Sequence, residues 1–194
     1  FKHIKFKIIK DIYSKSVGFN LELISMIIKN SGLIFILGLS NKIIYIGLIS
    51  TTKTMFQHFP IRIANILNNS LLLQFSSYYK KNKFDKTIIN LFFNSVIFIL
   101  IFLFLFFIFS YLFGILIYDF WTNDSYNLTI KLLLLIILDT TFYVIGNFLI
   151  TYRKAVNKYF KISFFELIIN IFTFIVIFLY ASKLNIAELY SIIV

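Results

Sequence analysis

The feature that most constrains the fold is a stretch of 32 residues, Thr87 to Tyr118, without a single charged side chain. Within it, residues 98–105 read Phe-Ile-Leu-Ile-Phe-Leu-Phe-Leu and show no alternation of polar and apolar positions. Membrane β-strands alternate over about 10 residues, whereas a helix needs about 20 apolar residues to cross the hydrocarbon layer. A helix also satisfies its own backbone hydrogen bonds in lipid. The stretch therefore predicts a transmembrane helix and excludes a soluble globular fold.

The rest of the chain has the same character, with 60% hydrophobic and only 14% charged residues in 194. A soluble domain has about 25% charged residues. Apolar runs between polar breaks predict five spans and the start of a sixth. We expect an all-α, polytopic helical membrane protein with a basic segment 1–17 before a transmembrane bundle 18–194. The predicted spans are about 18–37, 43–72, 88–117, 130–151, 162–181 and a truncated 188–194.

Basic residues gather on one side of this predicted bundle. Thirteen of the nineteen Lys and Arg residues fall in residues 1–17, 77–87 and 152–161, and three fall in the loops between the other span ends. Because positive loops stay in the cytoplasm, we expect these three segments to be cytoplasmic in a bacterial inner membrane. This topology accounts for the net charge of +11, so we expect no nucleic-acid partner.

Residues typical of soluble enzymes and metal sites are missing from the sequence. There is no cysteine, His3 and His58 lie far apart, and the six glycines form no phosphate-binding loop. The loops on the sparsely charged side are too short for the large outer loop of a membrane glycosyltransferase or polymerase. We therefore predict no catalytic residue, no metal site and no cofactor.

A polar stripe in the second predicted span is the strongest functional signal. Helical projection places its polar residues within an arc of about 140°. A polar face in a span turns toward other helices or toward water, so the stripe is either a packing seam or the wall of a translocation cavity. The stripe contains Thr51, Thr54, Gln57, His58, Arg62, Asn65, Asn68 and Asn69.

Two cations and a proline add detail to this span. Arg62 is a permanent cation that can hold a phosphate through two hydrogen bonds. Lys53 lies outside the arc and is either a second substrate-binding cation or a side chain that reaches to the interface. Pro60 removes an amide donor and predicts a kink, or weaker helix hydrogen bonding, near Phe56.

Lys29 and Asp139 have similar predicted depth, about twelve residues from the cytoplasmic ends of their spans. An unpaired ion at that depth is costly, which favours an ion pair between them. Asp139, Tyr143 and Asn147 repeat every fourth residue, and their shared face is also a candidate ion or proton site. Glu22 and Glu166 lie near cytoplasmic span ends, where we predict local salt bridges, for Glu166 with Lys161 or Arg153.

The order of these features resembles the polysaccharide flippase family of the multidrug/oligosaccharidyl-lipid/polysaccharide superfamily. The resemblance rests on segments 38–42, 46–48, 66–79, 116–121 and 147–158, which match its turns, its polar helix and its basic loops. That family often has Gly where Asn41 stands. The family fold has two six-helix bundles around a central cavity, so the resemblance implies about one bundle, and the chain, which begins at Phe1 rather than Met, is expected to be a fragment.

The resemblance implies that the protein flips undecaprenyl-diphosphate-linked oligosaccharides, with membrane lipids and possible polysaccharide polymerase and chain-length machinery as partners. It implies no bond chemistry, hence no enzyme. Alternatives are a cation-coupled multidrug exporter, a membrane glycosyltransferase or polymerase, and a structural subunit. In the flippase reading, the substrate-binding residues are Arg62, Lys53, Gln57, His58, Asn65, Asn68, Asn69 and Lys29.

Overall fold

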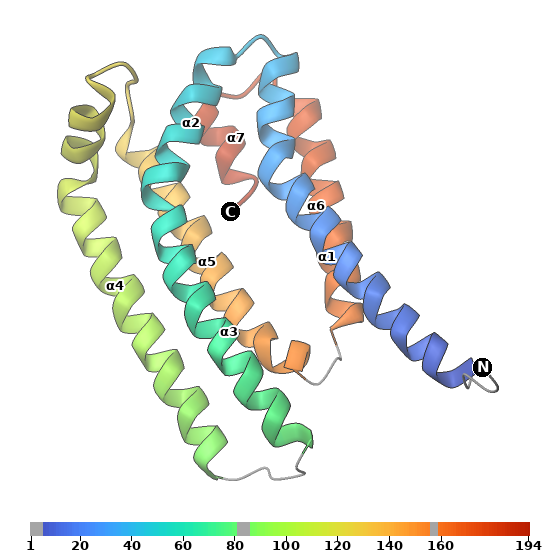
Figure 1. Cartoon of the computed structure of the whole chain (residues 1–194). Helices are drawn as coiled ribbons and strands as arrows, with labels where there is room; N and C mark the ends of the chain where they lie inside the picture. The colour runs from blue at the N-terminus through green and yellow to red at the C-terminus, as the bar shows by residue number, and fades with distance from the viewer. Residues whose placement is uncertain (1–5, 81–85, 156–158) are drawn as a thin grey trace.

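A computed structural model of the chain describes residues 6–80, 86–155 and 159–194, and all regular structure in these ranges is helical. The described part of the chain forms seven helices, whose arrangement and labels are given in Figure 1. Four of them are long and apolar enough to cross a membrane, in the ranges Ser16–Leu39, Ile89–Thr122, Ile130–Ala155 and Phe160–Tyr180. The chain is thus a multi-pass helical membrane protein. The helices are α1 (Phe6–Leu39), α2 (Ile43–Phe56), α3 (His58–Lys80), α4 (Lys86–Thr122), α5 (Ile130–Ala155), α6 (Phe160–Tyr180) and α7 (Ile186–Ser191).

Two helices extend or divide the predicted segments. Helix α1 begins at Phe6, so the described part of the basic segment 1–17 is helical and continuous with the first apolar span, which begins at Ser16. The predicted span 43–72 is divided into α2 and α3, and α3 continues to Lys80. The α2–α3 pair is not among the four long apolar helices, because α3 carries the polar stripe.

Pro60 accounts for the division of that span. It has no backbone N–H, so the carbonyl of Phe56 loses its helical partner. Gln57 lies at the break, where its N–H donates to the carbonyl of Lys53 (2.9 Å) and its carbonyl accepts from the N–H of Ile61 (3.2 Å). The predicted loss of regular hydrogen bonding near Phe56 is confirmed.

The turns use residues suited to them. Asn41 follows α1 with a φ of 55°, a left-handed conformation that Asn tolerates and that Gly adopts without strain. The ammonium of Lys42 in the same turn donates to the carbonyls of Ala181 (2.7 Å) and Leu184 (2.8 Å), just after α6. Asn185 and Glu188 form a capping box that starts α7. Lys42 therefore ties the α1–α2 turn to the α6–α7 turn.

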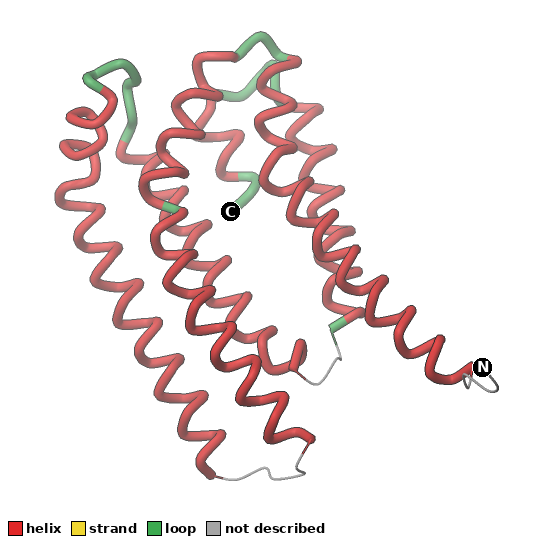
Figure 2. The backbone as a smooth tube through the Cα atoms, in the orientation of Figure 1, coloured by secondary structure: helices red, strands yellow, loops and turns green. Residues whose placement is uncertain are grey.

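The helices form two groups that meet at one end. Helix α6 packs along α1, whereas α3 packs along α5, with α4 beside them. Figure 1 shows the α1–α6 pair diverging from α3, α4 and α5 toward the end where α3 ends and α4 begins. We call this the basic end, because the predicted cytoplasmic segments lie there; Lys80, Lys86, Arg153 and Lys161 mark it. Figure 2 shows the loops at the opposite end of the bundle, in green.

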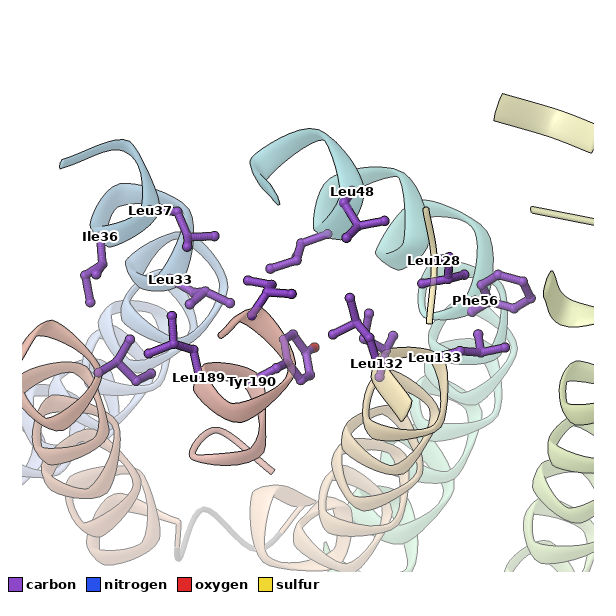
Figure 3. Packing of buried hydrophobic residues seen from close by; sticks show 14 of the residues in the cluster. Leu33, Ile36, Leu37, Leu48, Phe56, Leu128, Leu132, Leu133, Leu189 and Tyr190 are labelled. Atoms are coloured by element: carbon purple, nitrogen blue, oxygen red, sulfur yellow. The ribbon is translucent and has the colours of Figure 1, made fainter. Parts of the chain in front are cut away.

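Two apolar cores hold the helices together, one where the two groups meet and one within the second group. The larger one joins α1, α2, α5, α6 and α7 at the opposite end, and Figure 3 shows Leu189 and Tyr190 of α7 between Leu33 of α1 and Leu132 of α5. The smaller core joins α3, α4 and α5 through residues such as Leu71 and Val144. We call the two groups of helices arms: α1 with α6, and α3 with α4 and α5. Apolar packing holds the two arms together where they meet, and the basic half of the bundle is more open between them.

Candidate functional site

Asp139 of α5 is the centre of a polar cluster where the two arms meet. Its side chain is 2% exposed, and its Oδ1 lies 2.8 Å from Nζ of Lys29 on α1. The amide of Gln57, at the α2–α3 break, donates to Oδ2 (3.1 Å), and the hydroxyl of Tyr190 on α7 donates to the same oxygen (3.2 Å). The predicted ion pair is confirmed. Asp139 thereby connects both arms, the helix break and α7.

Lys53 joins this cluster from α2. Its ammonium lies over the ring of Tyr190, 5.4 Å from the ring centroid, and it interacts electrostatically with Asp139. The ammonium of Lys29 lies in the same way over Tyr143, 5.6 Å from the centroid. A cation over an aromatic face is attracted by the ring quadrupole. Lys53 is thus a member of this cluster, with its ammonium directed inward to Tyr190 rather than toward the interface, the second of the two roles left open for it.

The local sequence explains why this cluster forms. Pro60 ends α2 at Phe56 and leaves Gln57 between two helices, where its amide reaches α5. A buried carboxylate is tolerated when an opposite charge and hydrogen bonds satisfy its oxygens, and here Lys29, Gln57 and Tyr190 do so. Together with Lys53, these contacts bring α1, α2, α5 and α7 together at one point.

The polar stripe does not lie on one common surface. Gln57 and Asn68 are buried inside the bundle, whereas His58, Arg62, Asn65 and Asn69 are exposed on α3. Gln57 and Asn68 share one edge of the projected arc, and this edge faces the bundle, whereas the rest of the arc on α3 faces outward. We call these four exposed residues the α3 polar face.

Arg62 is the unusual member of the α3 polar face. It makes no ion pair with any residue that the structure describes. It lies 18 residues before the end of α3, about 27 Å along a helix axis, and so near the middle of the joined α2–α3 helices. One turn and a half further on, Oδ1 of buried Asn68 has no hydrogen-bond partner among the described residues. A bare cation at this depth in lipid is unfavourable, so this face requires water, a ligand or other protein.

The other predicted site residues have mixed outcomes. Tyr143 and Asn147 line a cavity with Lys29, whereas Asp139 does not line it, so the three form no common ion site on one open surface. Glu22 forms its predicted salt bridge, with Lys154 at the end of α5. The predicted salt bridge of Glu166 was wrong: in the described ranges Glu166 makes no ion pair, and it lines the same cavity instead.

Sequence reasoning missed the part of Tyr190 in the cluster. The residue lies in the short apolar stretch predicted at 188–194, and only the fold of α7 back against α5 brings it to Asp139. No group of three His, Cys, Asp or Glu side chains in the described part of the chain is arranged to hold a metal ion. Comparisons of the chain with models of protein families, with curated proteins and with solved structures found no match.

Proposed function

We propose that the protein is a membrane transporter that moves lipid-linked oligosaccharide diphosphates across a bacterial inner membrane, with its basic end in the cytoplasm. The observation that carries this proposal is the α3 polar face, which presents an arginine with no ion-pair partner among the described residues, near the middle of the joined α2–α3 helices. In this proposal the two helices together cross the membrane. A transporter must offer its polar cargo a path at that depth.

The chemistry of the α3 polar face fits such a cargo. The guanidinium of Arg62 presents parallel N–H donors that match two phosphate oxygens. Asn65 and Asn69 lie one turn apart on the same exposed face, and amides both donate to and accept from sugar hydroxyls. In this proposal the face lines a water-filled cavity that a second helical bundle closes from the other side.

The buried cluster has a different role in the proposal. Lys29, Lys53 and Gln57 were expected to bind substrate, but each is occupied within the protein by Asp139 or Tyr190. We assign them to holding the two arms together beside the cavity. Because Lys29 neutralises Asp139, this carboxylate is poorly suited to a free coupling cation, which favours the flippase over a cation-coupled exporter.

The test is complementation of a strain that lacks its own flippase with the gene for this protein, at matched protein levels. Arg62→Ala should abolish surface glycan and cause lipid-linked intermediates to accumulate at the inner leaflet, and Arg62→Lys should restore part of the export. The charge alone attracts a phosphate, whereas Lys lacks the paired donors of Arg.

The chain offers a matched control, because its only other arginine, Arg153, is exposed at the end of α5. Arg153→Ala removes the same charge from the basic end and should leave export unchanged. Normal export in the Arg62→Ala strain would contradict the proposal and make the α3 polar face a packing surface.

A further inference from the structure

A second polar region lies away from the α3 polar face, in a cavity of about 430 Å³ between α1, α5 and α6. It forms because α6 packs along α1 and α5 packs along α3, so that the two arms separate toward the basic end. Its volume falls in the range of small-molecule sites. One wall is polar and is formed by Glu22, Lys29, Tyr143, Asn147, Lys154 and Glu166.

The other wall is apolar and reaches the protein surface. Phe142 of α5 and Phe165 and Ile169 of α6 line the cavity, and each is more than half exposed, at 58%, 63% and 61%. These side chains belong to the apolar surface that faces lipid. The cavity therefore opens toward the hydrocarbon region through an apolar mouth, with its charges further in.

The charged wall lies close to the basic membrane surface. Glu22 lies six residues into the apolar part of α1, and Glu166 lies six residues into α6, which is about 9 Å along a helix axis in both cases. Lys154 is one residue from the end of α5. This is the level at which phospholipid head groups meet the acyl chains.

The balance of charges in the cavity indicates what it holds. Lys154 is paired with Glu22 and Lys29 with Asp139, yet both side chains keep about a quarter of their surface exposed, at 27% and 23%. Of the two carboxylates that line the cavity, Glu22 is paired and Glu166 makes no ion pair with any described residue. The cavity thus offers an unmatched negative charge next to ammonium groups that retain free N–H donors.

We propose that this cavity binds the head group of a phospholipid that carries a primary ammonium beside its phosphate diester, as in phosphatidylethanolamine. The ligand ammonium pairs with Glu166, the phosphate accepts hydrogen bonds from Lys154, and the acyl chains leave past Phe142 and Phe165. An anionic phospholipid without an amine could also place its phosphate at Lys154, but it would leave Glu166 without a cation. This site is independent of the proposed transport function.

Native mass spectrometry of the purified protein, with added phosphatidylethanolamine or phosphatidylglycerol, tests the proposal. We expect one phosphatidylethanolamine molecule to stay bound per chain in preference to phosphatidylglycerol. Glu166→Gln keeps the shape of the side chain and should weaken this binding about tenfold or more, because a charge-assisted hydrogen bond is lost. Asp124→Asn is the matched control and should bind as the wild type does. It removes an exposed carboxylate from the loop between α4 and α5, at the opposite end of the bundle from the cavity.

Gly146 gives a second, steric test. A Cβ added at this position meets no atom within 4 Å, so a larger side chain has open space to enter. Because Gly146 lines the cavity, Gly146→Leu should fill it and displace the bound lipid. Unchanged binding in both Glu166→Gln and Gly146→Leu, or tighter binding of phosphatidylglycerol than of phosphatidylethanolamine by the wild type, would overturn the proposal.

Discussion

At the scale of single residues, Asp139 is the most demanding group in the protein. It is a buried carboxylate whose two oxygens are satisfied by a cation, an amide and a phenol from three other elements. Removing one partner from such a pair leaves an uncompensated buried charge, which costs more than the intact pair contributes.

Lys29→Met should therefore destabilise the protein by about 3 kcal/mol or more. In the double variant Lys29→Met with Asp139→Asn, most of the stability should return, because no charge is left unpaired and Asn still accepts from Gln57 or Tyr190. Thermal unfolding of the purified proteins in detergent measures this difference. Equal stability of the single and double variants would show that the pair contributes little.

Several residue roles could be predicted, and the reasons differ. The Lys29–Asp139 pair followed from charge and depth, since a lone ion in a span is costly. Gln57 was predicted as polar lining, but its partner depends on the local break at Pro60, and Tyr190 depends on how α7 folds back. Glu166 was assigned to a salt bridge because basic residues are near it in sequence. In the structure α6 packs along α1, and the side chain of Glu166 lines the cavity.

At the scale of helices, close approach between α1 and α6 is the main contact that holds the α1–α6 arm together. Gly32 permits it, because a Cβ at that position would lie 2.8 Å from the ring of Phe174. Asn170 of α6 adds hydrogen bonds to Ser25 of α1, 2.7 Å to its hydroxyl and 3.3 Å to its carbonyl. Small residues in such interfaces let helix backbones approach closely in lipid.

Gly32→Ala should lower the free energy of unfolding by about 1–3 kcal/mol, because Phe174 must move to make room. Gly38→Ala on the same helix is the control, since its Cβ would meet only Ile46, at an ordinary 3.9 Å. That variant should be neutral or slightly more stable, because Ala favours helix. The same detergent unfolding assay compares them, and equal effects would contradict the packing role of Gly32.

The all-helical architecture and its four long apolar helices followed from the sequence, because apolar length and composition largely determine a span. The division of the predicted span 43–72 into α2 and α3 was not counted, because only one residue separates the two helices. The separation of the helices into two arms did not, because the pairing of α1 with α6 and of α3 with α5 depends on side-chain fit. The projection placed the polar residues of the predicted span 43–72 in one arc, but which edge of that arc is buried depends on how α3 packs against α5.

At the scale of the whole molecule, the distribution of basic residues predicts the orientation in the membrane. The chain contains no cysteine, so single substitutions can report which end faces the cytoplasm. Ser77 is exposed near the basic end, and Asn127 is exposed in the loop between α4 and α5 at the opposite end. Neither substitution changes the net charge.

An impermeant maleimide should label Asn127→Cys in intact cells and should label Ser77→Cys only after permeabilisation, because basic segments stay in the cytoplasm. Gel-shift labelling of the two variants measures this. The reverse pattern would refute the predicted topology and place the cavity between α1, α5 and α6 toward the outer leaflet.

The central claim is that the α3 polar face borders water and receives the cargo. The most direct measurement is the reaction of a water-soluble thiol reagent with single cysteines on α3 in the membrane-embedded protein. Asn65→Cys and Asn69→Cys should react readily, whereas the controls Phe104→Cys and Leu112→Cys, exposed on the apolar span of α4, should not. Failure of Asn65→Cys and Asn69→Cys to react would mean that the face is a dry packing surface and would contradict the proposed transport path.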